Sequence, residues 1–504
     1  MIRPIGQRRS ATNCSPRSAT GSPAATEENR ESSFRVAGVR PGSTGRERPR
    51  RPVAPGRRED AGCHGSPGGA DPDRHARDAG GKDPRPARSG REQAAGRRVD
   101  RAALPVRPDR RTGPVSRRAF LIVLDGLGIG RTADQDAYGD AGSDTLGNTL
   151  AQAETGYRLP NLEAWGLGRC APLARVAPAS APRAAWGTAH PISAGKDSTT
   201  GHWELTGLVL DRPFPTFPRG FPADLVAAFE RRTGRPVIGN RPASGTAILD
   251  ELAPRHVAEG AWIVYTSADS VFQVAAHEEV VPVAELYHAC EVARELCVGA
   301  VGVSRVIARP FVGSAGAWVR TPRRKDYSLE PTGPTLLDRL AEAGIPRVGI
   351  GKVDDLFAGR GIQSTHTPTN EAAFGLIREA MAGVGAGFVF ANVIEFDQTW
   401  GHRNDVPGFL AGLTELDLAL PGLVAGAQAD DLVIFTADHG NDPTTPSTDH
   451  SRERVPLLAW GPKVRPIDLG ERRSFADIGQ TLAEFFGVGP LTAGTSFLSE
   501  VWDG

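Results

Sequence analysis

The stretch FLIVL at residues 120–124 ends in an Asp-Gly pair. An uninterrupted apolar run of this kind predicts a strand that is buried on both faces, as in a parallel sheet covered by helices. Similar runs recur at 387–396 and 432–437, and helix-like stretches at 369–381 and 409–425 alternate with them. This alternation predicts an α/β fold with a mostly parallel sheet that is flanked by helices.

A carboxylate follows or ends each of the three apolar runs, and imidazoles lie near two of them. Ligands of open α/β sheets gather outside the carboxyl ends of the strands, so the three acids are expected to converge. A single Asp at a strand end more often caps a turn, and a lone His more often packs or faces solvent. The set as a whole is large enough to hold two divalent cations. The predicted metal ligands are Asp125, Asp397, His402, Asp438, His439 and His450.

A candidate nucleophile lies in AGKDSTTGHWELTG, residues 194–207, where Thr200 precedes Gly-His. Gly and hydroxyl residues suit a tight turn into a helix, where free backbone N–H groups can face an anion. Such a turn is usually no more than a helix cap. Lys196, Asp197 and His202 lie in the same stretch and favour the catalytic interpretation, because a hydroxyl bound to a divalent metal needs no separate histidine base. Thr200 is therefore the predicted nucleophile.

Several motifs occur in the order and approximate spacing of the phosphopentomutase family of the alkaline phosphatase superfamily. They are IVLDGLGIG, GKDSTTGHWE, YTSADSVFQVAAHEE, RVIARPFVG, GIGKVDDLF, FDQTWGHRND and TADHGND followed by TDHSRERVPLL. The resemblance covers residues 116–504, and GHWE and YTSADS distinguish this family within the superfamily. It implies an alkaline-phosphatase-like core, two bound metals that are commonly manganese, and a phosphate carried by Thr200.

The resemblance also implies a substrate cap inserted into the core. Residues 117–210 and 326–504 are expected to form the metal-binding catalytic core, and 211–325 a smaller inserted α/β domain with its own strands and helix. By resemblance, the pentose phosphate site is lined by Ser267, Asp269, Val271, Arg305, Ile307 and Arg309 of the cap and by Lys352 of the core. Arginines suit a phosphate group that does not react.

The implied reaction interconverts ribose 1-phosphate and ribose 5-phosphate, or their 2-deoxyribose counterparts, in nucleoside catabolism and salvage. Phosphothreonine would give its phosphate to the bound sugar, form a bisphosphate and take the other phosphate back. Glucose 1,6-bisphosphate or a pentose 1,5-bisphosphate would prime the enzyme. Ser198 stands where the family more often has Thr, Glu395 where Asp is usual, and Trp400 where Tyr is usual.

Other functions are compatible with parts of the pattern. A phosphomonoesterase or a cofactor-independent phosphoglycerate mutase would share the metal ligands, but the GHWE and YTSADS segments favour the phosphopentomutase. A non-catalytic scaffold that holds nucleic acid through an Arg-rich N-terminus would need the whole ligand set without an activity. The partners expected for the core are small pentose phosphates, with no nucleic acid and no membrane.

Residues 1–116 differ in composition from the rest of the chain. They are rich in Arg, Gly, Pro, Ser and Ala and poor in aromatic and branched apolar residues, which predicts a disordered extension. The start site could also be drawn too far upstream, with synthesis from near Val115. Acidic and basic residues balance at 59 each, and the five cysteines form no CxxC pair. This cysteine pattern predicts a reducing cytoplasmic location. No apolar run is long enough for a membrane span, so the chain is not expected to cross a membrane.

Overall fold

The computed structural model describes residues 117–267 and 269–504. The expectation of a disordered extension at 1–116 therefore lies outside the described residues. Within the described ranges, no helix has both the length and the apolar character that crossing a membrane requires.

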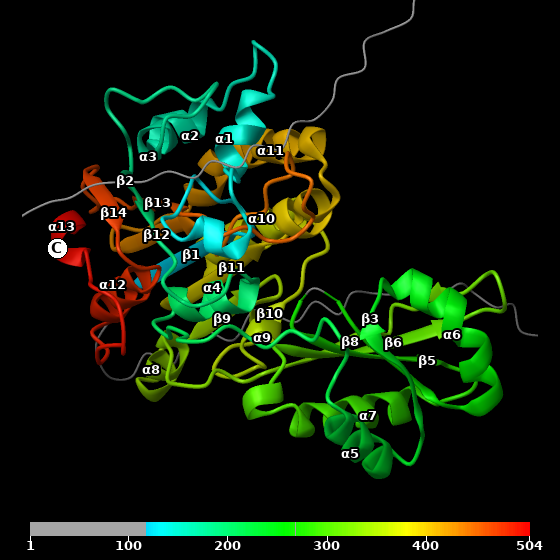
Figure 1. Ribbon diagram of the computed structural model, residues 1–504. Coiled ribbons are helices and arrows are strands. Elements are labelled where there is room, and N and C mark those ends of the chain that lie inside the picture. The colour runs from blue at the N-terminus through cyan, green and yellow to red at the C-terminus, as the bar shows by residue number, and fades with distance from the viewer. Residues whose placement is uncertain (1–116, 268) are drawn as a thin grey trace, which may run out of the picture. The chain divides into compact units, whose positions relative to one another are not determined.

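An eight-stranded sheet forms the centre of the first and larger part of the molecule (Figure 1). Its strands in spatial order are β10 (Ser364–Thr365), β9 (Arg347–Ile350), β11 (Gly387–Val393), β1 (Arg118–Leu124), β12 (Asp431–Thr436), β13 (Val455–Trp460), β2 (Ala185–Ala189) and β14 (Asp468–Arg472). All neighbours pair in parallel except β13, which runs antiparallel to both β12 and β2. The prediction of a mostly parallel sheet is confirmed.

Helices cover both faces of this sheet (Figure 1). One layer holds α1 (Thr145–Ala151), α2 (Pro160–Trp165), α3 (Leu167–Cys170), α10 (Asn370–Gly383) and α11 (Val406–Val424); the other holds α4 (Ser198–Leu205), α8 (Leu336–Glu342), α9 (Val353–Leu356) and α12 (Ala476–Phe486). The residues of β1, β11 and β12 are all buried, as continuous apolar strands between two helix layers must be. The short helix α13 (Leu498–Val501) closes the described chain.

A buried ion pair joins the starting ends of β1 and β12. Arg118 is fully buried, and its guanidinium donates to both carboxylate oxygens of Asp431 at 2.8 and 2.5 Å. The same guanidinium donates to the backbone carbonyls of Met381 and Val384 at the end of α10. A buried charge needs partners of this kind, and the bonds fix β1 against its neighbours at the edge opposite to the predicted site.

A second, six-stranded sheet is formed between residues 217 and 328, a segment called here the insert. Its strands are β3 (Val237–Pro242), β4 (Trp262–Thr266), β5 (Val271–His277), β6 (Arg305–Val312), β7 (Val319–Arg320) and β8 (Lys325–Ser328), in the order β3-β4-β5-β6-β7 with β8 also on β6. Helices α5 (Ala223–Thr233) and α7 (Val283–Leu296) share one apolar cluster with the sheet, and α6 (Gly245–Glu259) shares another. The domain boundaries at 211 and 325 stay predictions, and β8 extends the sheet to Ser328.

Candidate active site

Three carboxylates meet at the carboxyl ends of adjacent parallel strands. Asp125 follows β1, Asp438 follows β12, and Asp397 lies in the π-helical turn Phe396–Trp400 that comes after β11. Because β11, β1 and β12 are neighbours in the sheet, the three side chains converge at one edge. All three are buried.

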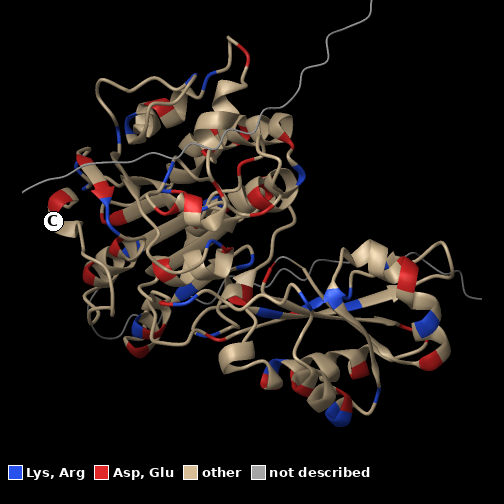
Figure 2. Ribbon diagram, viewed as in Figure 1, with Lys and Arg blue, Asp and Glu red and all other residues tan. Residues whose placement is uncertain are grey.

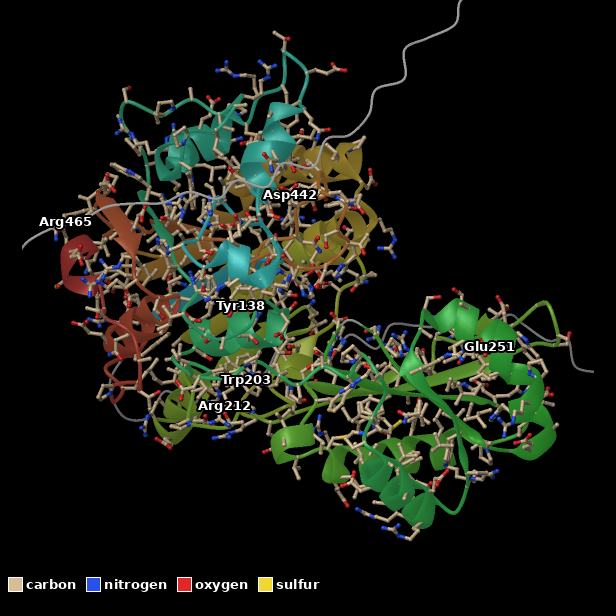
Figure 3. The ribbon with its side chains drawn as sticks, in the orientation of Figure 1. Tyr138, Trp203, Arg212, Glu251, Asp442 and Arg465 are labelled. Carbon is tan, nitrogen blue, oxygen red and sulfur yellow. The ribbon has the colours of Figure 1, made fainter. Side chains whose placement is uncertain are left out.

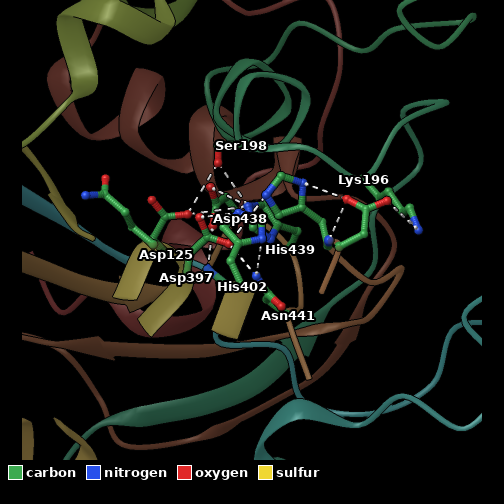
Figure 4. A network of polar contacts seen from close by, with 12 residues as sticks. Asp125, Lys196, Ser198, Asp397, His402, Asp438, His439 and Asn441 are labelled. Atoms are coloured by element: carbon green, nitrogen blue, oxygen red, sulfur yellow. Dashed lines mark hydrogen bonds and ion pairs between the residues drawn. The ribbon is translucent and has the colours of Figure 1, made fainter. Parts of the chain in front are cut away.

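Three imidazoles complete this cluster, and Figure 4 labels His402 and His439 among them. The Nε2 atom of His439 lies 3.4 Å from a carboxylate oxygen of Asp125 and 3.4 Å from one of Asp438. The Nε2 atoms of His402 and His450 each lie 3.4 Å from a different oxygen of Asp397. The structure thus brings all six predicted metal ligands together, and they are called the ligand cluster below.

Negative charge dominates the ligand cluster. Burial alone would lower the pKa of His439, but the carboxylates of Asp438, Asp125 and Asp397 raise it to about 10. Burial also opposes protonation of His402, yet its pKa rises to about 9 through Asp397. Protonated imidazoles balance the carboxylates when no cation is present, and metal binding would release those protons.

The donor atoms fit two divalent cations. Ligand atoms of Asp125, Asp438 and His439 lie within 4.8 Å of one another, and so do those of Asp397, His439 and His450. One carboxylate oxygen of Asp438 is buried and accepts no hydrogen bond among the described residues, although imidazole nitrogens of His202 and His439 lie 3.1 and 3.4 Å from it. A buried oxygen of this kind suits a cation ligand. Mixed carboxylate and imidazole sets of this kind bind manganese, zinc, cobalt or magnesium.

The start of α4 places the hydroxyl of Ser198, and not that of the predicted nucleophile Thr200, beside the ligand cluster. Ser198 is the first residue of the helix, and its Oγ lies 3.1 Å from Nε2 of His439 and 3.4 Å from Oδ1 of Asp125. The hydroxyl of Thr200 instead donates to Oδ2 of Asp197, the N-cap residue, at 2.6 Å. Thr200 is therefore part of the helix cap, and Ser198 presents the hydroxyl at the ligand cluster.

Two residues that follow Thr200 position α4 against the end of β12. A Cβ on Gly201 would clash with the carbonyl of Asp438, so glycine permits this close approach. The buried imidazole of His202 donates from Nδ1 to the carbonyl of Ser198 at 2.9 Å, and that nitrogen lies 3.1 Å from Asp438. The sequence assigned His202 no specific role. In the structure its imidazole lies between the carbonyl of Ser198 and the carboxylate of Asp438.

The rest of the GHWE segment anchors the helix in the protein. Trp203, labelled in Figure 3, is fully buried and donates its indole N–H to the carbonyl of Leu356. The buried carboxylate of Glu204 accepts hydrogen bonds from the backbone N–H groups of Ile192, Ser193 and Phe475 and from the hydroxyl of Ser474. In the sequence this segment is a signature of the family. In the structure its Trp and Glu side chains hold α4 in place through these buried hydrogen bonds.

Asn441 is a further polar contact that the sequence did not predict. Its side-chain amide donates to Oδ1 of Asp397 at 2.7 Å and lies 3.3 Å from His402. It follows His439 by two residues in TADHGND, which was the available signal. Asn441 therefore orients a ligand carboxylate from outside the ligand cluster.

The predicted substrate residues divide into two groups. A cavity of about 1010 Å³ is lined by Asp269, Arg305, Arg309 and Lys352 together with His402 and other members of the ligand cluster. Lys352 lies 2.7 Å from Asp125, and its ammonium donates to Oγ of Ser198 at 3.5 Å. The lining does not include three described residues, Ser267, Val271 and Ile307, although Val271 pairs with Arg305 across the β5–β6 ladder.

Comparisons with known proteins agree with this geometry. A model of the metalloenzyme superfamily matches residues 117–490. The phosphopentomutase of Caldanaerobacter subterraneus subsp. tengcongensis is 51% identical over 386 residues, which are 76% of this chain and 98% of the relative. That of Dictyoglomus thermophilum is 52% identical over 390 residues, 77% of this chain and 99% of the relative. These matches and the central sheet confirm the predicted fold class, an α/β fold with an alkaline-phosphatase-like core.

Solved structures show a more distant likeness. The PH0037 protein of Pyrococcus horikoshii is 17% identical, covers 73% of this chain and 97% of its own, and gives a TM-score of 0.39.

Proposed function

Since this chain belongs to the phosphopentomutase family, isomerases of the metalloenzyme superfamily, we propose that it moves phosphate between C1 and C5 of ribose or 2-deoxyribose. Ribose 1-phosphate and ribose 5-phosphate, or the corresponding deoxyribose phosphates, are its substrates. The activity serves nucleoside catabolism and salvage in the cytoplasm.

The observation that carries this proposal is the contact between one hydroxyl group and the ligand cluster. Oγ of Ser198 lies within 3.5 Å of Asp125, His439 and Lys352. A hydroxyl held beside metal ligands and an ammonium group is placed to accept and return a phosphoryl group. We therefore assign phosphate transfer to Ser198 and withdraw Thr200 from that role.

The two cations, proposed to be Mn²⁺, would be held by the residues of the ligand cluster. Asp125, Asp438 and His439 would supply one group of donors. Asp397 and His450 would supply the other, together with His402, whose Nε2 lies 3.4 Å from Asp397. Divalent cations in such a pair lower the pKa of a hydroxyl and neutralise the charge on a transferring phosphoryl group.

The remaining steps are assigned to residues of this chain. The bond between Oγ of Ser198 and phosphorus breaks as a sugar hydroxyl forms its own bond to that phosphorus, which gives a sugar bisphosphate. In this step the sugar hydroxyl gives up its proton and Oγ of Ser198, freed from phosphorus, takes one up. In the return step Oγ of Ser198 gives up that proton as it bonds to the other phosphate, and the sugar oxygen that this phosphate leaves takes it up, so the two halves balance. Lys352, Arg305 and Arg309 hold phosphate oxygens, and Asp269 holds sugar hydroxyls. Ser267, Val271 and Ile307, which the resemblance also assigns to the sugar site, lie outside the cavity lining and are proposed to shape the site from the insert.

The resting enzyme needs a phosphate on Ser198 before the first turnover. Glucose 1,6-bisphosphate, or a pentose 1,5-bisphosphate, is proposed to supply it. The phosphoserine must then be protected from water, since its hydrolysis would turn the isomerase into a phosphatase.

The direct test is the conversion of ribose 1-phosphate to ribose 5-phosphate by the purified full chain with MnCl₂ and a catalytic amount of glucose 1,6-bisphosphate. Free phosphate is measured in the same reaction. Isomerisation with little phosphate release is expected. Phosphate release without isomerisation would identify a phosphomonoesterase, and turnover of 3-phosphoglycerate would identify a phosphoglycerate mutase; either result would refute the proposal.

A further inference from the structure

Arg452 is enclosed within the larger part of the molecule. Figure 2 shows Lys and Arg segments interspersed with Asp and Glu segments along the ribbon of that part. Only 2% of Arg452 is exposed, and it follows the metal ligand His450 by two residues. Arginine keeps its charge in proteins, so a buried guanidinium needs acceptors for its N–H groups.

All five N–H groups of this guanidinium have an acceptor. Nη1 donates to the carbonyls of Ser193 and Gly195 at 2.6 and 2.7 Å, and Nη2 donates to that of Pro191 at 3.0 Å. Nε and Nη2 also donate to the carboxylate of Asp134, at 3.1 and 2.9 Å. Three carbonyls of one short segment are therefore bonded to one side chain.

These carbonyls belong to residues 191–197, called here the nucleophile loop, which lead directly into α4 and its first residue, Ser198. Two backbone N–H groups of the same loop donate to Glu204, a residue of α4 itself. Glu204 thus ties the loop to its own helix, whereas Arg452 ties it to the chain segment that carries His450. The guanidinium therefore links the hydroxyl residue to the ligand cluster.

The backbone of Arg452 is held independently of its side chain. Its N–H donates to Oδ2 of Asp140 at 2.8 Å, and its carbonyl accepts a hydrogen bond from Nε2 of Gln135 at 3.2 Å. Both partners are buried. A change in the Arg452 side chain should therefore leave the path of the chain at His450 in place and release the nucleophile loop.

Tyr138 connects this network to the large cavity. Its ring lies over the guanidinium of Arg452 at 4.7 Å, and the residue is labelled in Figure 3. Tyr138 lines the cavity together with Gly195 and Lys196 of the nucleophile loop, whereas Arg452, a described residue, is not part of that lining. Arg452 therefore acts on a bound ligand only through the loop.

We propose that Arg452 is a positioning residue for phosphoryl transfer, whose guanidinium holds the nucleophile loop so that Oγ of Ser198 stays in line with the transferring phosphorus. A misplacement of about 1 Å at a reacting centre can cost about a hundredfold in rate. Lysine cannot replace the fork of five donors, because it offers three donors from a single atom. The role of Ser198 as phosphate carrier rests on the proposed function, and the contacts of Arg452 with the loop do not.

The binding test uses orthovanadate, which takes a hydroxyl oxygen as a fifth ligand and so mimics the transition state of phosphoryl transfer. Calorimetry measures its affinity for the manganese-loaded full chain in wild type, Arg452→Lys, Ser198→Ala, the double variant and the control Arg454→Gln. Arg454 lies two residues further on and pairs with the exposed Glu471. We expect R452K and S198A each to weaken vanadate binding at least tenfold, and R454Q to change it less than twofold.

The double variant separates positioning from a general loss of structure. In the S198A background R452K should weaken vanadate binding less than twofold further, because no Oγ is left to position. Manganese affinity of R452K should stay within twofold of wild type. The inference would be overturned by additive losses in the double variant, by equal vanadate affinities of R452K and R454Q, by a loss of manganese affinity as large as that of vanadate, or by a wild type that binds no vanadate.

Asp134→Asn provides the same test if R452K does not fold. The Asp134 side chain is 46% exposed, and the substitution leaves the three carbonyl bonds of Arg452 in place. D134N should weaken vanadate binding about threefold when Ser198 is present and leave it unchanged in S198A. An equal effect in both backgrounds would contradict the positioning role.

Kinetics with ribose 1-phosphate separate this inference from the proposed function. R452K should lower kcat at least tenfold and change KM less than twofold, because the side chains that hold the substrate are unchanged. If wild type does not isomerise the sugar phosphate but the vanadate pattern holds, the proposed function fails and the positioning role stands. A raised KM with an unchanged kcat would overturn the inference even in an active isomerase.

Discussion

Ser198 and Thr200 begin the same helix, and their hydroxyl groups have different partners. Ser198 faces His439 and Asp125, whereas Thr200 is bonded to the N-cap residue Asp197. We expect Ser198→Ala to abolish both the phosphoenzyme and isomerisation, because no hydroxyl then remains at the ligand cluster. Thr200→Val should retain activity within about tenfold and lose about 1 kcal/mol of stability with the cap contact.

Phosphoenzyme is measured by intact-protein mass spectrometry after incubation with glucose 1,6-bisphosphate. Bound manganese is measured in parallel and should be retained by both variants. Ser198→Thr, which restores the residue more often found in the family, serves as the control that keeps a hydroxyl. A phosphorylated S198A protein together with an unphosphorylated T200V protein would return the role to Thr200.

Glu453 is a buried carboxyl group with an unusual titration. It accepts hydrogen bonds from Ser451 and from the backbone and hydroxyl of Thr145, and it has no cationic partner among the described residues. Burial raises its pKa from 4.5 to about 8. The folded state therefore keeps a proton between these values that the unfolded state releases, and stability falls as pH rises through this window.

Glu453→Gln cannot ionise, so the variant should escape that loss. Its free energy of unfolding relative to wild type should increase from pH 5 to pH 8, by at most about 1.4 kcal/mol per pH unit, and level off above pH 8. Urea unfolding of EDTA-treated protein at each pH measures the difference. A difference that does not change with pH would show that Glu453 is ionised in the folded state throughout.

At the scale of elements, α11 supports the turn that carries Asp397. The ring of Trp400 lies against α11 where a Cβ on Gly408 or Gly412 would clash with it. The sequence marked Trp400 as a departure near His402, and these glycines provide the space for its larger ring.

Gly412→Ala should displace Trp400 and with it the turn between Asp397 and His402. We expect manganese affinity to fall several-fold and stability to fall by about 1 to 3 kcal/mol. Gly422→Ala on the same helix is the control, since its nearest new contact would be 3.6 Å from Arg378. Calorimetric titration with MnCl₂ compares the two, and Trp400→Tyr in the G412A background should recover affinity. Equal affinity in G412A and G422A would show that the Trp400 contact does not position the ligands.

Some elements carry site residues that can be predicted from their sequence, and others do not. The ends of β1, β11 and β12 could be predicted, because strands buried on both faces must be apolar and their carboxyl ends share one edge. Which of Ser198 and Thr200 faces the ligand cluster could not be predicted, because it depends on where α4 begins. The start of α4 is positioned by the close approach of Gly201 to Asp438, a contact between residues distant in sequence. Arg324 in the cavity lining was missed because it precedes β8, and only the pairing of β8 with β6 brings this segment to the cavity.

At the scale of the whole molecule, the apolar side chains form clusters that share no residue between the two sheets. One cluster surrounds the eight-stranded sheet, and two lie within the insert. All six residues of the ligand cluster belong to the part built on the first sheet. Cation binding should therefore stabilise that part and leave the insert to unfold according to its own packing.

Hydrogen exchange with and without MnCl₂ tests this separation. A cation at a hundred times its dissociation constant should add about 2.7 kcal/mol of protection to peptides of β1 and β12 and almost none to β5.

Phe272→Ala, which removes a buried ring 4.5 Å from that of Phe221, should cost the insert about 3 to 5 kcal/mol without reducing manganese protection of β12. Phe388→Ala in β11 is the matched cavity in the first sheet and should lower β12 protection instead. Equal manganese protection of β5 and β12 would mean that the insert and the first sheet unfold as one cooperative unit, in which case packing across the two must outweigh the separate clusters.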